Sequence, residues 1–120
     1  MSNIHFYRCD SCGIIAVAFG EHPLPQLKEL VPNTVDARGE KHLPVVKVEG
    51  DKLIARIGSV DHPMVPEHFI QWVFVETDKG IHRLDLQPGE APEAVFSIPG
   101  EKPVAVYEYC NLHGLWKTAL

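Results

Sequence analysis

Short apolar runs separated by turn residues dominate the chain from Val45 onward. They predict strands at residues 45–48, 52–58, 69–77, 81–86, 94–98 and 104–110, the last of which ends the pattern. Within 69–77, alternation places Ile70, Trp72 and Phe74 on one face of the strand. Nothing requires a helix of ordinary length. We therefore predict an all-β fold, an immunoglobulin-like β-sandwich of about seven strands with a small N-terminal β appendage.

The first 32 residues form a different pattern. Residues 4–20 predict a strand-turn-strand unit around Cys9-Asp10-Ser11-Cys12-Gly13, which has the shape of a metal-binding knuckle. A tetrahedral site needs four ligands, and only His5 and His22 lie nearby, at irregular spacing, so a turn with two free thiols is the simpler interpretation. Residues 21–32 contain three prolines and predict an irregular cover. We expect a small domain at 1–32 and the sandwich at 33–120.

Composition and charge narrow the function. The 120 residues carry 11 basic and 16 acidic side chains and no basic run, which argues against nucleic acid as a partner. No apolar run reaches the length of a membrane span, and the N-terminus lacks a secretion-signal pattern, so we expect no membrane partner and a cytoplasmic location. Three cysteines make no disulfide framework, and a hydrophobic content of 45% suffices for a core without one.

Residues of the types that bind metals fall in three separated segments. The candidates are His42 in a polar loop, His62 and His68 on either side of two prolines, and Cys110 and His113, three residues apart before a glycine. The prolines exclude a regular element between His62 and His68, so that segment is a loop and can curl. Because the loops of a sandwich gather at its ends, all five groups can converge on one site.

Four imidazoles and one thiolate exceed the ligand count of a tetrahedral zinc site. Five ligands suit a first-row redox metal, for which iron is the leading choice. If the imidazoles lie in a plane with the thiolate below, the sixth position is open, and the thiolate donates electron density to whatever binds there. Two alternatives remain at this point. One is an immunoglobulin-like module with a redox-inert structural metal, and the other is an electron carrier centred on the N-terminal knuckle.

Four motifs, in order, resemble one known family. They are Glu40-Lys41-His42-Leu43-Pro44, His62-Pro63-Met64, His68-Phe69-Ile70-Gln71-Trp72 and Cys110-Asn111-Leu112-His113-Gly114-Leu115-Trp116, together with the turn Gln87-Pro88-Gly89-Glu90-Ala91-Pro92. From about residue 33 to residue 116 the chain is similar to the superoxide reductases, that is, desulfoferrodoxin and neelaredoxin. The resemblance implies one mononuclear non-haem iron per chain, with the four histidines His42, His62, His68 and His113 as equatorial ligands and Cys110 as the axial ligand.

The same resemblance implies an oxidoreductase that reduces superoxide by one electron, releases hydrogen peroxide and makes no dioxygen. Lys41 would stand near the open position and attract the superoxide anion, since an acidic protein needs a local positive charge there. Glu40 would be able to occupy the sixth position once the iron is oxidised. An external electron donor such as rubredoxin would restore the ferrous state.

The N-terminal part departs from the desulfoferrodoxin pattern, in which a small four-cysteine iron domain precedes the sandwich. Residues 1–32 resemble such a desulforedoxin-like segment but lack the second cysteine pair. We therefore expect no second iron at Cys9 and Cys12. We also expect the segment to assist assembly into a homo-oligomer, either a dimer or a tetramer.

Overall fold

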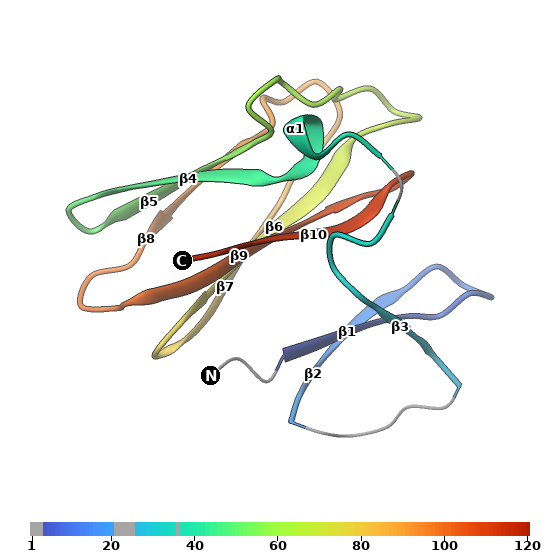
Figure 1. Cartoon of the computed structure of the whole chain (residues 1–120), viewed down its shortest axis with the longest axis horizontal. Coiled ribbons are helices and arrows are strands. Elements are labelled where there is room, and N and C mark those ends of the chain that lie inside the picture. The colour runs from blue at the N-terminus through green and yellow to red at the C-terminus, as the bar shows by residue number, and fades with distance from the viewer. Residues whose placement is uncertain (1–3, 21–25, 36) are drawn as a thin grey trace. The chain divides into compact units, whose positions relative to one another are not determined.

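The computed structural model describes residues 4–20, 26–35 and 37–120 (Figure 1). The chain forms two compact units, Met1–Val31 and Pro32–Leu120, which divide one residue before the boundary expected from the sequence. Each unit is described by itself. No helix in the described part of the chain is long and apolar enough to cross a membrane.

The first unit is a three-stranded antiparallel sheet in the order β2-β1-β3, formed by β1 (Ile4–Arg8), β2 (Ile15–Phe19) and β3 (Lys28–Leu30). The knuckle between β1 and β2 is closed by two backbone hydrogen bonds, from Gly13 N to Cys9 O at 2.7 Å and from Cys9 N to Ile14 O at 2.9 Å. Strand β3 lies in the stretch that was expected to be irregular, where its three residues pair with β1.

The second unit is a sandwich of two antiparallel sheets, ordered β10-β9-β6-β7 and β4-β5-β8 (Figure 1). Its elements are α1 (Gly39–His42), β4 (Pro44–Glu49), β5 (Lys52–Ile57), β6 (Ile70–Thr77), β7 (Gly80–Asp85), β8 (Glu93–Ser97), β9 (Pro103–Cys110) and β10 (Gly114–Ala119). The prediction of an all-β sandwich of about seven strands is confirmed. Two details were wrong, because α1 forms a short helix where a loop was expected, and β10 follows the strand that was expected to be the last.

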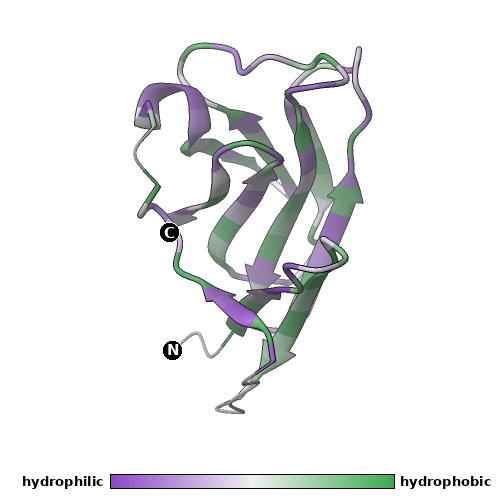
Figure 2. Cartoon of the chain, turned by 90° about the vertical axis from the view of Figure 1, so that its right-hand side faces the viewer, coloured by the Kyte–Doolittle hydropathy of each residue, from purple (hydrophilic) through white to green (hydrophobic). Residues whose placement is uncertain are grey.

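The core of the second unit lies between its two sheets. Hydrophobic and hydrophilic stretches alternate along the strands in Figure 2, as expected when one face of each sheet is buried. The main contributors are Leu53, Ala55 and Ile57 from β5, Val73 and Val75 from β6, Ala94 and Phe96 from β8, and Val106 and Cys110 from β9. Cys110 therefore belongs to the core and to the end of a strand at the same time, and its position is fixed by packing.

A bulge in β6 corrects the predicted alternation. Ile70 pairs with Cys110 and Trp72 pairs with Tyr109, so β6 advances by two residues where β9 advances by one. The extra residue places Ile70 in the core together with Val73, whereas regular alternation had grouped Ile70 with Trp72. Trp72 stacks instead on Tyr109 across the strands, with ring centroids 5.7 Å apart.

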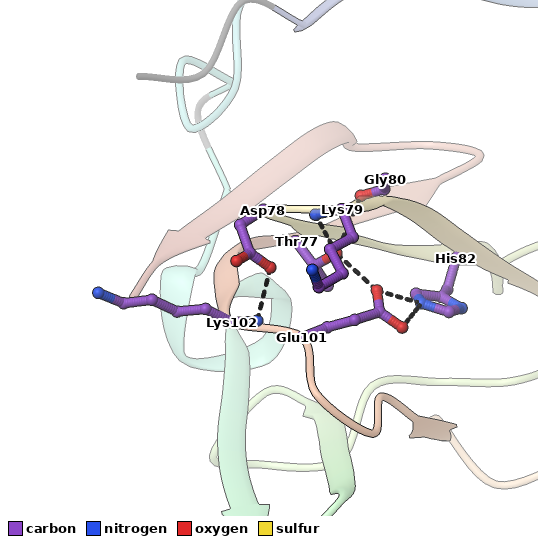
Figure 3. A network of polar contacts seen from close by, with 7 residues as sticks. All are labelled: Thr77, Asp78, Lys79, Gly80, His82, Glu101 and Lys102. Carbon is purple, nitrogen blue, oxygen red and sulfur yellow. Dashed lines mark hydrogen bonds and ion pairs between the residues drawn. The ribbon is translucent and has the colours of Figure 1, made fainter.

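Glu101 connects the β6–β7 hairpin to the segment before β9 (Figure 3). The Thr77 hydroxyl lies 2.6 Å from a Glu101 carboxylate oxygen, and His82 Nε2 lies 3.0 Å from the same oxygen. These hydrogen bonds, that from Thr77 first, lower the pKa of Glu101 below its usual value. The charged form of Glu101 therefore stabilises the folded state at neutral pH.

Glu101→Gln is expected to lower the thermal midpoint of unfolding at neutral pH, because the amide replaces a charge-assisted acceptor. Since the folded-state pKa of Glu101 is the lower one, this contribution is present above the unfolded pKa and is lost as pH falls through the folded pKa. The difference in midpoint between wild type and variant should therefore narrow below pH of about 4. Asp51→Asn, in an exposed turn of the same unit, is the control. An equal difference at all pH values would contradict the assignment.

Candidate metal centre

One end of the sandwich gathers side chains of ligand type from three separate segments (Figure 1). His42 ends α1, His62 and His68 lie in the loop between β5 and β6, Cys110 ends β9, and His113 lies in the turn before β10. One potential ligand atom from each of these five residues lies within 4.8 Å of all the others. The structure thus brings together all five residues that the sequence proposes as metal ligands.

The four imidazoles form a closed square. Ring centroids of neighbours are 4.8 Å apart for His42 and His62, 4.7 Å for His62 and His68, 5.1 Å for His68 and His113, and 4.8 Å for His113 and His42. Each neighbouring pair meets edge to face, at interplanar angles between 74° and 86°. The rings therefore surround a common axis, as four ligands arranged around one ion would.

Hydrogen bonds of His42 and His62 fix which nitrogen of each ring is free. His42 Nδ1 lies 2.7 Å from the carbonyl oxygen of Arg38, and His62 Nδ1 lies 2.7 Å from that of Pro63. Because a carbonyl only accepts, both Nδ1 atoms carry the proton, and Nε2 of each neutral ring presents a bare lone pair. The two Nε2 atoms lie 3.2 Å apart. Two lone pairs at that distance repel unless a cation lies between them.

Protonation of the rings is disfavoured as a source of that cation. Burial lowers the pKa of His62 to about 4, and burial followed by the charge of neighbouring imidazoles and of Lys41 lowers the pKa of both His42 and His68. In addition, Nε2 of His68 is buried and has no hydrogen-bond partner among the described residues. A metal ion satisfies these nitrogens together, so the residues present fit a metal.

Cys110 provides the thiol of this cluster. Its side chain is fully buried, and Sγ lies 3.9 Å from Nδ1 of His113. Burial raises the pKa of the thiol, backbone N–H groups of Leu112 and His113 lower it, and buried Glu108 on the same strand raises it again. Because burial favours the neutral thiol, coordination to a cation is the interaction that makes a thiolate stable here.

A cavity of about 280 Å³ opens over the imidazoles. Its lining consists of Ala37, Arg38, Lys41, His42, His62, Pro63, His68 and His113. The described residues of this lining include two cationic side chains, those of Arg38 and Lys41, and no carboxylate. The cavity therefore favours a small anion.

Comparison with known proteins identifies the family. The family model described as Desulfoferrodoxin matches residues 34–119. This chain belongs to the desulfoferrodoxin family. A desulfoferrodoxin from Syntrophotalea carbinolica is 43% identical, with 96% of this chain and 95% of the relative covered. A superoxide reductase from Pyrococcus horikoshii is 35% identical, with 76% and 94% covered. The crystal structure of the superoxide reductase from Treponema pallidum aligns with a TM-score of 0.82 at 35% identity, over 96% of this chain and 98% of that one.

The two residues expected to be catalytic in this desulfoferrodoxin lie side by side on α1. Lys41 is half-buried and lines the cavity. Glu40 is exposed, lies outside the lining of the cavity, and forms an ion pair with Arg38 at 3.6 Å. Arg38 was not among the sequence candidates, although it lies four residues before His42 and one helical turn would have placed it nearby.

The loop after β5 holds α1 in place. Gly58 N donates to Leu43 O and Val60 N donates to Glu40 O, both at 3.1 Å. Gly58 has a φ of +84°, and a Cβ on it would lie 2.4 Å from Val60 O and 2.8 Å from Glu40 O. A side chain here meets backbone atoms that cannot move away cheaply. Sequence reasoning took Gly58 only as the end of a strand, because no local signal distinguishes it from other turn glycines.

Trp116 and Asn111 position the remaining ligands of the cluster. Trp116 stacks on the His42 ring with centroids 4.9 Å apart, and its indole N–H donates to the carbonyl of His113 at 3.0 Å. The Asn111 side chain accepts from Phe69 N at 3.0 Å and donates to the carbonyl oxygen of Glu67 at 3.1 Å. Asn111 thus clamps both neighbours of His68 onto the turn that carries Cys110 and His113.

Asn111→Ala is expected to destabilise the second unit by about 2 kcal/mol, because it leaves polar backbone groups beside His68 unpaired. Retention of metal against a chelator should fall with it, as loss of an outer partner usually weakens a metal site. Asn33→Gly is the matched control, since Asn33 also makes two side-chain hydrogen bonds, both to the backbone of Lys117, at a φ of +64°. Equal metal retention in both variants would contradict the role assigned to Asn111.

Proposed function

We propose that the protein is a superoxide reductase, which reduces superoxide by one electron to hydrogen peroxide at a non-haem iron. The observation that carries the proposal is the square of four imidazoles, with a buried thiol beside it, under a cavity with two cationic side chains. The relative from Pyrococcus horikoshii and the structural neighbour from Treponema pallidum, both named superoxide reductases, support the proposal.

His42, His62, His68, Cys110 and His113 would hold the iron. Bound iron supplies the single electron that converts superoxide and two protons into hydrogen peroxide. The carbonyl groups of Arg38 and Pro63 keep the Nδ1 protons of His42 and His62 in place and so keep their Nε2 atoms available. Neutral rings are needed for this, and burial keeps them neutral at the pH at which superoxide is an anion.

The residues of α1 would serve the substrate. Lys41 attracts the superoxide anion into the cavity, and Arg38 adds a second positive charge at its rim. Glu40 is the carboxylate that the resemblance assigns to the sixth position after oxidation, and its ion pair with Arg38 holds it outside the cavity. We further propose an external electron donor of the rubredoxin type, a homo-oligomeric state and a cytoplasmic location, in agreement with the sequence expectations.

Product stoichiometry tests this function. The iron-loaded protein is supplied with superoxide and an electron donor, and peroxide and dioxygen are measured together. A superoxide reductase gives one hydrogen peroxide for each superoxide consumed and no dioxygen. A dismutase gives one peroxide for every two superoxide molecules, together with dioxygen, and that result would exclude the proposal. Oxidation of the reduced protein by dioxygen as fast as by superoxide would favour a simple electron carrier instead.

A further inference from the structure

Two thiols lie outside the metal centre, at the two ends of the knuckle between β1 and β2. Cys9 is half-buried and Cys12 is exposed, and both are free thiols. Backbone hydrogen bonds from Gly13 N to Cys9 O and from Cys9 N to Ile14 O hold this turn closed. The two sulfurs are therefore held on one short turn and are open to small solutes.

The knuckle lacks the further ligands that a metal site requires. Among the described residues, the one group of three or more His, Cys, Asp and Glu side chains close enough to share an ion is the cluster at His42, and neither Cys9 nor Cys12 belongs to it. The imidazole of His5 contacts the Glu29 carboxylate at 2.8 Å. His22 lies outside the described residues. Two thiols without further ligands leave thiol chemistry as the use of the pair.

Cys9 has the character of an attacking thiol and Cys12 that of a resolving thiol. The sulfur of Cys9 lies 3.2 Å from the Ser11 hydroxyl. Hydrogen bonds from the Cys12 thiol and then from Ser11 lower the pKa of Cys9 to about 7, so a large share is thiolate at neutral pH. Burial raises the pKa of the third cysteine, Cys110, which keeps it out of such chemistry.

We propose that Cys9 and Cys12 form a reversible dithiol–disulfide site that is oxidised by hydrogen peroxide. The Cys9 thiolate attacks one peroxide oxygen, the O–O bond breaks, and the departing hydroxide takes up a proton as water, which leaves a sulfenic acid on Cys9. The Cys12 thiol then attacks the Cys9 sulfur, an S–S bond forms, and a second water leaves. A dithiol reductant returns both thiols by exchange. In so far as the peroxide is the enzyme's own product, the inference rests on the proposed function.

Peptide mapping of the full-length, iron-loaded protein tests this proposal. The protein is reduced with dithiothreitol, desalted under anaerobic conditions, treated with added hydrogen peroxide, quenched with acid and alkylated. We expect Cys9 and Cys12 to lose their alkylation together through a disulfide within one chain, and dithiothreitol to restore it. In Cys12→Ser, dimedone should label Cys9, whereas in Cys9→Ser the oxidation of Cys12 should be slower by about tenfold or more. Ser11→Ala should keep the disulfide but shift the pH midpoint of Cys9 oxidation upward from about 7.

Three results would overturn the proposal. Both thiols could remain fully alkylated after peroxide treatment, Cys9 could pass to sulfinic acid without a disulfide, or metal bound between two chains could protect both thiols before any peroxide is added. Because peroxide is added directly, these outcomes do not depend on whether the protein reduces superoxide. Failure of the proposed function would show instead in the product stoichiometry, with the thiol chemistry unchanged.

Discussion

Gly58→Ala is expected to dismantle the metal centre although Gly58 holds no ligand atom. The new Cβ would lie 2.4 Å from Val60 O, 2.8 Å from Glu40 O and 2.9 Å from the carbonyl carbon of Lys41, all of which are backbone atoms. The φ of +84° adds strain for any residue with a side chain. Relief requires α1 to move away, and His42 moves with it. We expect a loss of about 3 kcal/mol in the free energy of unfolding and the loss of most of the bound iron.

Gly50→Ala separates the two causes of that loss. Gly50 also has a left-handed φ, of +59°, but a Cβ there meets nothing within 4 Å. This control should cost about 1 kcal/mol from strain alone and keep its iron. The measurement is iron per chain after dialysis, together with denaturant unfolding of each variant. A Gly58→Ala protein that keeps iron as the wild type does would show that the loop does not hold α1 in the way described.

Lys41→Ala is expected to slow the reaction with superoxide by about tenfold at low ionic strength, because Lys41 lines a cavity in a protein of net charge −5. The remaining rate should also depend less steeply on salt, or in the opposite sense, since the acidic surface then dominates the field. Stopped-flow or pulse-radiolysis measurement of the second-order rate constant at several salt concentrations gives both quantities.

Two further variants make the Lys41 result specific. Lys47→Ala removes the same charge from β4, where Lys47 is exposed and ion-paired with Glu49 at 2.7 Å, and it should leave the rate unchanged. Lys41→Arg keeps the charge and should retain most of the rate. If Lys41→Ala reacted with superoxide as fast as the wild type at every ionic strength, the steering role assigned to Lys41 would be wrong.

The sequence predicted the ligands better than the geometry that holds them. Spacing and prolines placed His62 and His68 in a loop, and resemblance grouped them with His42 and the Cys110 turn, as the structure shows. The bulge after Ile70 was missed, because alternation cannot show where an extra residue enters a strand. The contact between Gly58 and α1 was missed for a similar reason. It depends on backbone atoms that are distant in sequence, and backbone atoms leave no pattern in the side chains.

The N-terminal knuckle illustrates the opposite limit. Its C-x-x-C sequence permits a metal site or a thiol pair, and the sequence alone left both open. The decisive observation is three-dimensional, because no third ligand from the described residues joins Cys9 and Cys12. The lowered pKa of Cys9 likewise depends on where the Cys12 and Ser11 side chains lie in the turn.

The central claim is that His42, His62, His68, Cys110 and His113 hold one iron, and metal analysis tests it most directly. Iron and zinc per chain are measured in the purified native protein and in a His62→Ala variant. The account predicts about one iron and no zinc in the wild type, and far less iron in the variant. Zinc alone in the native protein, with no uptake of iron on reconstitution, would contradict it and would indicate a structural metal module.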